Sequence, residues 1–116
     1  MPSNEDFSLP FSRRLRGKVE FEKLLKGRYT ANQWLAVYKR ENRLEISRLG
    51  MIVSKRLLPR AVQRNRVKRM IRESFRHQFS GIGGMDIVVR LRRPLYRETL
   101  PEGRAALDKL LDTLAK

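Results

Sequence analysis

A long amphipathic helix is the feature of this sequence that most constrains its fold. Pro59 opens the helix, and apolar residues recur at helical spacing to about Phe79, just before the glycine cluster at 81–84. At about 100° per residue, one face of this helix collects an apolar arc. The arc consists of Val67, Met70, Ile71, Ser74 and Phe75. We therefore expect the helix to pack this face on a core.

The same segment is strongly basic, with nine basic residues and one acid, Glu73, between positions 55 and 76. The basic residues are Lys55, Arg56, Arg60, Arg64, Arg66, Lys68, Arg69, Arg72 and Arg76. Four of them follow one another along the side of the helix next to the apolar arc, and we call this set the cationic ridge: Arg64, Lys68, Arg72 and Arg76. Cations four residues apart repel by roughly a few tenths of a kcal/mol per pair, so the ridge favours a polyanionic partner over a merely solvated face. Arginine suits phosphate in particular, because its guanidinium donates two parallel hydrogen bonds.

The remaining segments predict three strands and two shorter helices. The expected helices lie at 19–25 and after Thr99, and the expected strands lie at 34–40, 46–54 and 85–91. A turn at Glu41 and Asn42 joins the first two strands, which predicts an antiparallel hairpin. Thr99 and Glu102 match a capping box at the start of the last helix. The order α-β-β-α-β-α indicates the α+β class.

Composition limits what this chain can do. Its 116 residues allow one small domain, expected over 13–116 after an extended arm over 1–12. The absence of cysteine and the single histidine, His77, exclude disulfides, thiolate or multi-histidine metal sites and a histidine relay. We therefore assign no catalytic residue and no metal. The longest apolar run, 34–38, is far shorter than a membrane span, and the first residues lack a secretory pattern. We expect a cytoplasmic protein with no membrane partner.

The net charge indicates a nucleic-acid partner. The chain has 27 Lys and Arg against 12 Asp and Glu, a formal net charge of +15. A small domain needs a net charge of only about 2–8 to be soluble. Because the basic helix is expected between strands rather than in a helix-turn-helix pair, RNA fits better than DNA, and we expect no DNA partner.

Two motifs resemble the protein subunit of bacterial ribonuclease P. The first runs over 62–75 and contains the string Arg-Asn-Arg, and the second runs over 48–56 and ends in Ser-Lys-Arg. The resemblance extends to the Arg-Leu-Arg string at 14–16 with Phe21, and to the Asp-Ile-Val-Val string at 86–89. The resemblance covers about residues 13–115, in the expected order. It implies an α+β fold in which the second and third expected strands pair in parallel through a left-handed crossover.

The resemblance also implies a function. Ribonuclease P removes the 5′ leader of precursor tRNA, and its RNA subunit is the catalyst in bacteria and uses Mg²⁺. The protein subunit itself binds no cofactor. Its RNA partners are therefore the RNA subunit and precursor tRNA.

Particular residues are assigned to these two partners by the resemblance. The basic helix contacts the RNA subunit through Arg64, Asn65, Arg66, Lys68, Arg69 and Arg72, and we add the basic residues ahead of it, Lys55, Arg56 and Arg60. A cleft between the first helix and the sheet holds the leader at Phe21, Leu25, Ala36 and Tyr38. Leu25 stands where many members have a second phenylalanine. Arg13, Arg14 and Arg16 are expected phosphate contacts.

Spacing alone leaves alternatives open. Phe21 and Tyr38 also fit ordinary core packing. A structural RNA-binding protein of the ribosomal type shares the charge and the small α+β format. A free-standing nuclease is disfavoured, because the common acid–base and nucleophilic constellations are absent.

Overall fold

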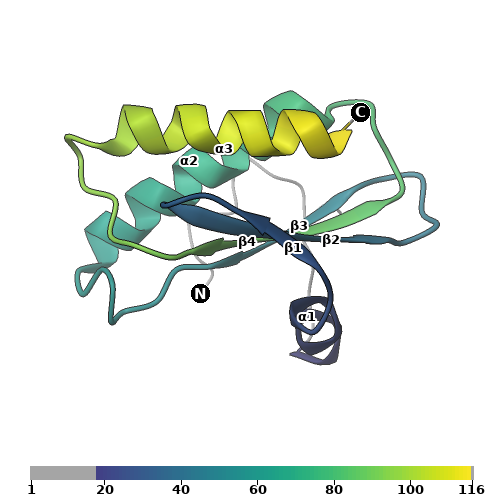
Figure 1. The fold of residues 1–116 in the computed structure, drawn as a ribbon, viewed down its shortest axis with the longest axis horizontal. Helices are drawn as coiled ribbons and strands as arrows, with labels where there is room; N and C mark the ends of the chain where they lie inside the picture. Colours follow the sequence, from purple (N-terminus) through teal and green to yellow (C-terminus); the bar gives the residue numbers. More distant parts are fainter. Residues whose placement is uncertain (1–17, 116) are drawn as a thin grey trace.

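In the part of the chain that the structure describes, three helices cover the two faces of one sheet (Figure 1). The structure is a computed structural model that describes residues 18–115, and of residues 18–21 the backbone alone. The helices are α1 (Lys18–Leu25), α2 (Ala61–Phe79) and α3 (Leu100–Ala115). α2 and α3 lie together on one face of the sheet, and α1 lies on the opposite face. Among the described residues, no helix is long and apolar enough to span a membrane.

The sheet has four strands in the order β1-β2-β4-β3. The strands are β1 (Tyr29–Ala31), β2 (Leu35–Glu41), β3 (Arg48–Ile52) and β4 (Met85–Leu91). β2 pairs with β1 and with β4, both antiparallel, whereas β3 pairs with β4 in parallel. The parallel pairing implied by the resemblance is therefore confirmed.

The sequence predicts a hairpin between the first two long strands, which are β2 and β3. This prediction is wrong, because β4 lies between them in the sheet. Burial explains the order. Ile87, Val88 and Val89 are consecutive and fully buried. β4 therefore needs helices over both faces of the sheet and a neighbouring strand along each edge. In β3 the last residues, Met51 and Ile52, are only half-buried, which suits an edge strand. β1, which is three residues long, was not expected from the sequence.

The main core lies between the sheet and the pair α2 and α3. The apolar arc expected on α2 is confirmed, since all five of its residues are buried. Leu107 and Leu111 bring α3 into the same core. Phe75 also stacks on Phe79, with ring centroids 5.2 Å apart. Each such side chain contributes about 1.5–3 kcal/mol by leaving water.

Glycines make the turn that leads from α2 into β4. α2 ends at Phe79, as the periodicity predicts. Gly81 and Gly84 have φ values of 76° and 86°, which glycine adopts without steric cost. At Gly83 a Cβ atom would lie 2.0 Å from the carbonyl oxygen of Glu45, so the two backbones meet only because no side chain is present.

The start of α3 differs in detail from the expected capping box. The Thr99 hydroxyl accepts a hydrogen bond from the backbone N–H of Tyr96 at 3.1 Å and donates one to the Tyr96 carbonyl at 3.3 Å. Thr99 thus closes the turn before the helix, and its own carbonyl accepts from Gly103 N–H at 3.1 Å.

Candidate nucleic-acid interface

Arg64, the first residue of the cationic ridge, makes two hydrogen bonds at the start of α2. Arg64 donates from Nη1 to the carbonyl oxygens of Leu58 at 3.0 Å and Pro59 at 2.9 Å. The Gln63 side chain accepts from Arg60 N–H at 3.2 Å, which caps the same end. Arg64 therefore ties the helix to the preceding loop.

The other RNA-subunit residues expected from sequence lie on or just ahead of α2. Lys68 and Arg66 are half-buried, and Asn65 and Arg69 are exposed. Lys55, Arg56 and Arg60 are exposed in the segment between β3 and α2. That segment is folded by Ser54, whose carbonyl accepts from Leu58 N–H at 3.1 Å. These residues thus lie in the N-terminal half of α2 and in the segment that precedes it.

The expected exposure of Arg72 on the cationic ridge is wrong. Its side chain is only 3% exposed. The reason is that the buried face of α2 is wider than the apolar arc, because it includes Phe79. Phe79 lies seven residues after Arg72, about two turns further along nearly the same line of the helix.

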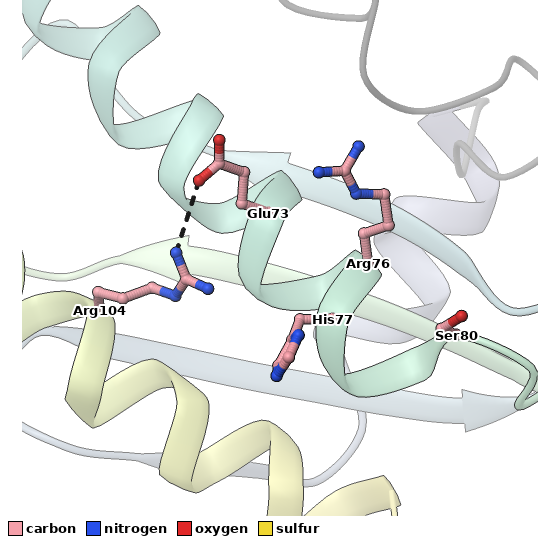
Figure 2. A pocket seen from close by; sticks show the side chains of 5 residues that line it. All are labelled: Glu73, Arg76, His77, Ser80 and Arg104. Carbon is pink, nitrogen blue, oxygen red and sulfur yellow. Dashed lines mark ion pairs between the residues drawn. The ribbon is translucent and has the colours of Figure 1, made fainter.

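A polar groove lies beside the contact between α2 and α3, and Figure 2 shows five residues that line it. Arg104 of α3 points toward Glu73 of α2, with Nη1 and Oε1 3.6 Å apart. Its Nε also donates to Asp108 at 3.1 Å, and Asp108 accepts from the Ser74 hydroxyl. These contacts fasten the two helices together.

Arg66 and Arg69 lie toward α3 rather than along the cationic ridge. They line a cavity of about 260 Å³ with Met70, Leu100 and Arg104. The expected RNA-subunit residues therefore occupy two sides of α2: Arg64 and Lys68 on one, and Arg66 and Arg69 on the other.

A second surface lies on the sheet face that α1 covers. Leu24 packs there with Ala36, Tyr38 and Val88, and half-buried Leu25 packs against them. Ala36 is fully buried and Tyr38 is 5% exposed, so they form the floor of this surface. The Phe21 side chain, Arg13, Arg14, Arg16 and the arm over 1–12 lie outside the described residues.

Asp86 fixes the register of three strands at one end of this face. Its fully buried carboxylate accepts from Arg48 Nε and Nη2 at 2.8 Å each, from Arg40 Nη2 at 2.7 Å and from Asn42 Nδ2 at 2.8 Å. Burial alone would raise the pKa of Asp86. The hydrogen bonds from Arg48, Asn42 and Arg40 outweigh burial and hold this pKa below its ordinary value.

Two residues of this face, Arg90 and Tyr29, were not expected from the sequence. The Arg90 guanidinium lies over the Tyr38 ring, 5.9 Å from its centroid. Tyr29 is the direct partner of Tyr38 in the β1–β2 pair, and their ring centroids are 5.1 Å apart. Alternation along β4 could have identified Arg90, since it stands two residues after Val88. No signal identified Tyr29, because β1 was not expected.

Arg90 also lines a cavity of about 410 Å³ beyond the ends of β3 and β4. Arg56 and Arg92 bring two further guanidinium groups to its walls, with Ser54 and Ile52 beside them. Arg56 belongs to the basic segment ahead of α2, so this cavity connects the α1 face with the basic end of α2. Among the described residues, no group of three or more His, Cys, Asp or Glu side chains is placed to hold a metal ion.

Comparisons with known proteins agree with this geometry. The family model Ribonuclease P matches residues 9–115. The ribonuclease P protein component of Chromobacterium violaceum is 40% identical over 86 residues, covering 74% of this chain and 71% of that protein. The Staphylococcus aureus RNase P protein has a TM-score of 0.77 at 35% identity, with 88% and 94% of the two chains covered. The Thermotoga maritima RNase P protein has a TM-score of 0.70 at 34% identity, with 89% and 94% covered. The chain therefore belongs to the ribonuclease P protein family, the protein part of the ribonucleoprotein endoribonuclease that matures the 5′ ends of tRNAs.

Proposed function

We propose that this chain binds the catalytic RNA subunit of ribonuclease P through α2 and the 5′ leader of precursor tRNA through the α1 face of the sheet. The observation that carries the proposal is the placement of cations on both faces of the sheet. The basic residues of α2 and of the segment before it lie on one side, and Arg90 lies over Tyr38 on the α1 face. Membership of the family supports the two RNA partners, and we assign each partner to one of the two surfaces.

Binding of the RNA subunit rests on the charge of α2 and of the segment before it. The contacting residues are Lys55, Arg56, Arg60, Arg64, Asn65, Arg66, Lys68 and Arg69. Buried Arg72 supports this surface from its edge rather than reaching a phosphate directly. Phosphate contacts of this kind position an RNA without reading its sequence. The folded RNA subunit is the partner that such a surface fits.

Binding of the leader rests on aromatic and aliphatic residues flanked by arginine. Leu25 of α1 packs over Ala36 and Tyr38, which form the floor. We assign Phe21 of the same helix to this surface as well. Arg90 lies over Tyr38, where its charge suits the phosphates of a single strand. Stacking on aromatic faces tolerates any base, which a leader of variable sequence requires.

The protein contributes binding and position rather than chemistry. Cleavage belongs to the RNA subunit with Mg²⁺, and the protein neutralises phosphates that would otherwise repel one another. Arg13, Arg14 and Arg16 add phosphate contacts at the start of the domain over 13–116, next to the arm over 1–12. The cytoplasm is the expected location, since precursor tRNA is processed there in bacteria.

The test is to add the purified chain to its catalytic RNA and to measure leader removal from precursor tRNA over a range of Mg²⁺ concentrations. The expected result is cleavage at lower Mg²⁺ with the protein than without it, and none with the protein alone. Cleavage by RNA-free protein after removal of contaminating nucleases would contradict the proposal. An Mg²⁺ requirement that the protein leaves unchanged would contradict it as well.

A further inference from the structure

Tyr38, the aromatic residue expected to stack on the leader, offers almost no free surface. It is 5% exposed and packs in one cluster with Leu24, Ala36 and Val88. The Arg90 guanidinium and the Tyr29 ring both lie against its ring, at 5.9 Å and 5.1 Å between centres. A base could reach its face only by displacing one of these groups.

Tyr29 is the aromatic residue of this face that remains open. It is 57% exposed, although it belongs to a strand of the sheet. It is paired directly with Tyr38, so both side chains point to the face that α1 covers. β1 is the outermost strand, and α1 packs through Leu24 and Leu25 over the inner strands. The Tyr29 ring therefore lies at the rim of the proposed leader surface.

The surroundings of Tyr29 suit a nucleotide. Arg28 immediately precedes it and Lys26 stands three residues before it. Both cations are exposed, so positive charge adjoins the ring in sequence. The Tyr38 ring lies against Tyr29, tilted by 35°, and limits its motion. A ring held in this way loses little conformational entropy when a base stacks on it.

We propose that Tyr29 stacks on an unpaired base of the precursor tRNA leader, with Tyr38 as its support and with Lys26 and Arg28 beside the adjoining phosphates. This inference rests on the proposed function, since it assigns a residue to the same leader surface. It moves the stacking contact from the floor of the surface to its outer rim.

The experiment uses the holoenzyme reconstituted from the chain and its catalytic RNA. The quantity measured is the ratio of affinities for a precursor tRNA with a long leader and for one with a one-nucleotide leader. Replacement of the ring in Tyr29→Leu, which keeps apolar cover over Tyr38, should lower this ratio by about 5- to 150-fold, the range for loss of one stacked base. Tyr29→Phe keeps the ring and should stay within about twofold of the wild type.

The chain supplies a matched control in Tyr96, another exposed tyrosine, 47% exposed, in the loop between β4 and α3. Tyr96→Leu should leave the ratio unchanged. A leader with 2-aminopurine placed at successive positions gives a direct readout, because stacking quenches its fluorescence. One position should lose its quenching in Tyr29→Leu and retain it in Tyr29→Phe.

Failure of this inference and failure of the proposed function are distinguishable. If the wild-type holoenzyme shows no preference for the long leader, the proposed leader surface is wrong. If the wild type prefers the long leader and Tyr29→Leu keeps both that preference and the quenching, Tyr29 only covers Tyr38 and the inference is overturned. Circular dichroism at the assay temperature confirms that each variant is folded.

Discussion

Arg48 binds Asp86 through two parallel hydrogen bonds of 2.8 Å, which join the edge strand β3 to the central strand β4. Arg40 binds the same carboxylate from β2, so one buried acid connects three strands. Replacing it by Asp86→Asn should lower the free energy of unfolding by about 2–4 kcal/mol, because two arginines lose the partner of their charge. Urea denaturation measures this, with Glu98→Gln as an exposed control. A loss no larger than that of the control would contradict the role given to Asp86.

The same carboxylate makes stability depend on pH. The pKa of Asp86 lies lower in the folded chain than in the unfolded one, so its ionised form stabilises the fold above the unfolded pKa. This stabilisation should disappear as the pH falls below about 4 and passes through the folded pKa. The difference in unfolding free energy between wild type and Asp86→Asn should therefore shrink from pH 7 to pH 2. A difference that stays constant over this range would show that charge is not its source.

Much of the fold follows from periodicity, and the exceptions have physical causes. The apolar arc of α2, from Val67 to Phe75, is visible in sequence because helical spacing over many residues is a strong signal. The neighbours of a strand are not visible in the same way. The turn near Asn42 suggested a hairpin, but the buried run from Ile87 to Val89 decides which strand is central.

The candidate site was predictable where charge alone defines it. The cations of α2 are evident from sequence, whereas the burial of Arg72 reflects a buried face of the helix that is wider than the apolar arc and extends to Phe79. Exposure of Tyr29 depends on a three-residue strand that local propensity does not identify. Alternation along β4 puts Arg90 on the same face as Val88, but the sequence does not show that α1 covers this face.

The glycine turn gives a prediction that separates two effects on stability. Gly83→Ala places a Cβ atom 2.0 Å from the Glu45 carbonyl oxygen, so backbone must move. Gly81→Ala meets no atom within 4 Å and carries only the strain of its φ of 76°. We expect losses of about 2–4 kcal/mol for Gly83→Ala and about 1 kcal/mol for Gly81→Ala. Thermal unfolding by circular dichroism compares them, and equal losses would contradict the close approach at Gly83.

The cations of α2 predict a salt dependence. Lys68→Ala and Arg66→Ala should weaken assembly with the RNA subunit and should each reduce the log–log salt slope by roughly 0.7–0.9 per lost phosphate contact. Arg64→Ala should also lower the melting temperature, because it frees the carbonyl oxygens of Leu58 and Pro59. Arg97→Ala, an exposed cation in the loop between β4 and α3, serves as the control. A double variant of Lys68 and Arg66 with the wild-type slope would contradict this assignment.

The central claim is that two surfaces bind two different RNAs. The most direct test measures two quantities for each variant. One is the affinity of the holoenzyme for precursors with long and with one-nucleotide leaders, and the other is the affinity of the protein for the RNA subunit. Phe21→Ala with Arg90→Ala should reduce the preference for the long leader and leave assembly with the RNA subunit unchanged. Arg66→Ala with Lys68→Ala should weaken assembly and leave the preference unchanged once the holoenzyme is saturated. If each folded double variant changed both quantities in the same proportion, the chain would have one RNA surface and the account would be wrong.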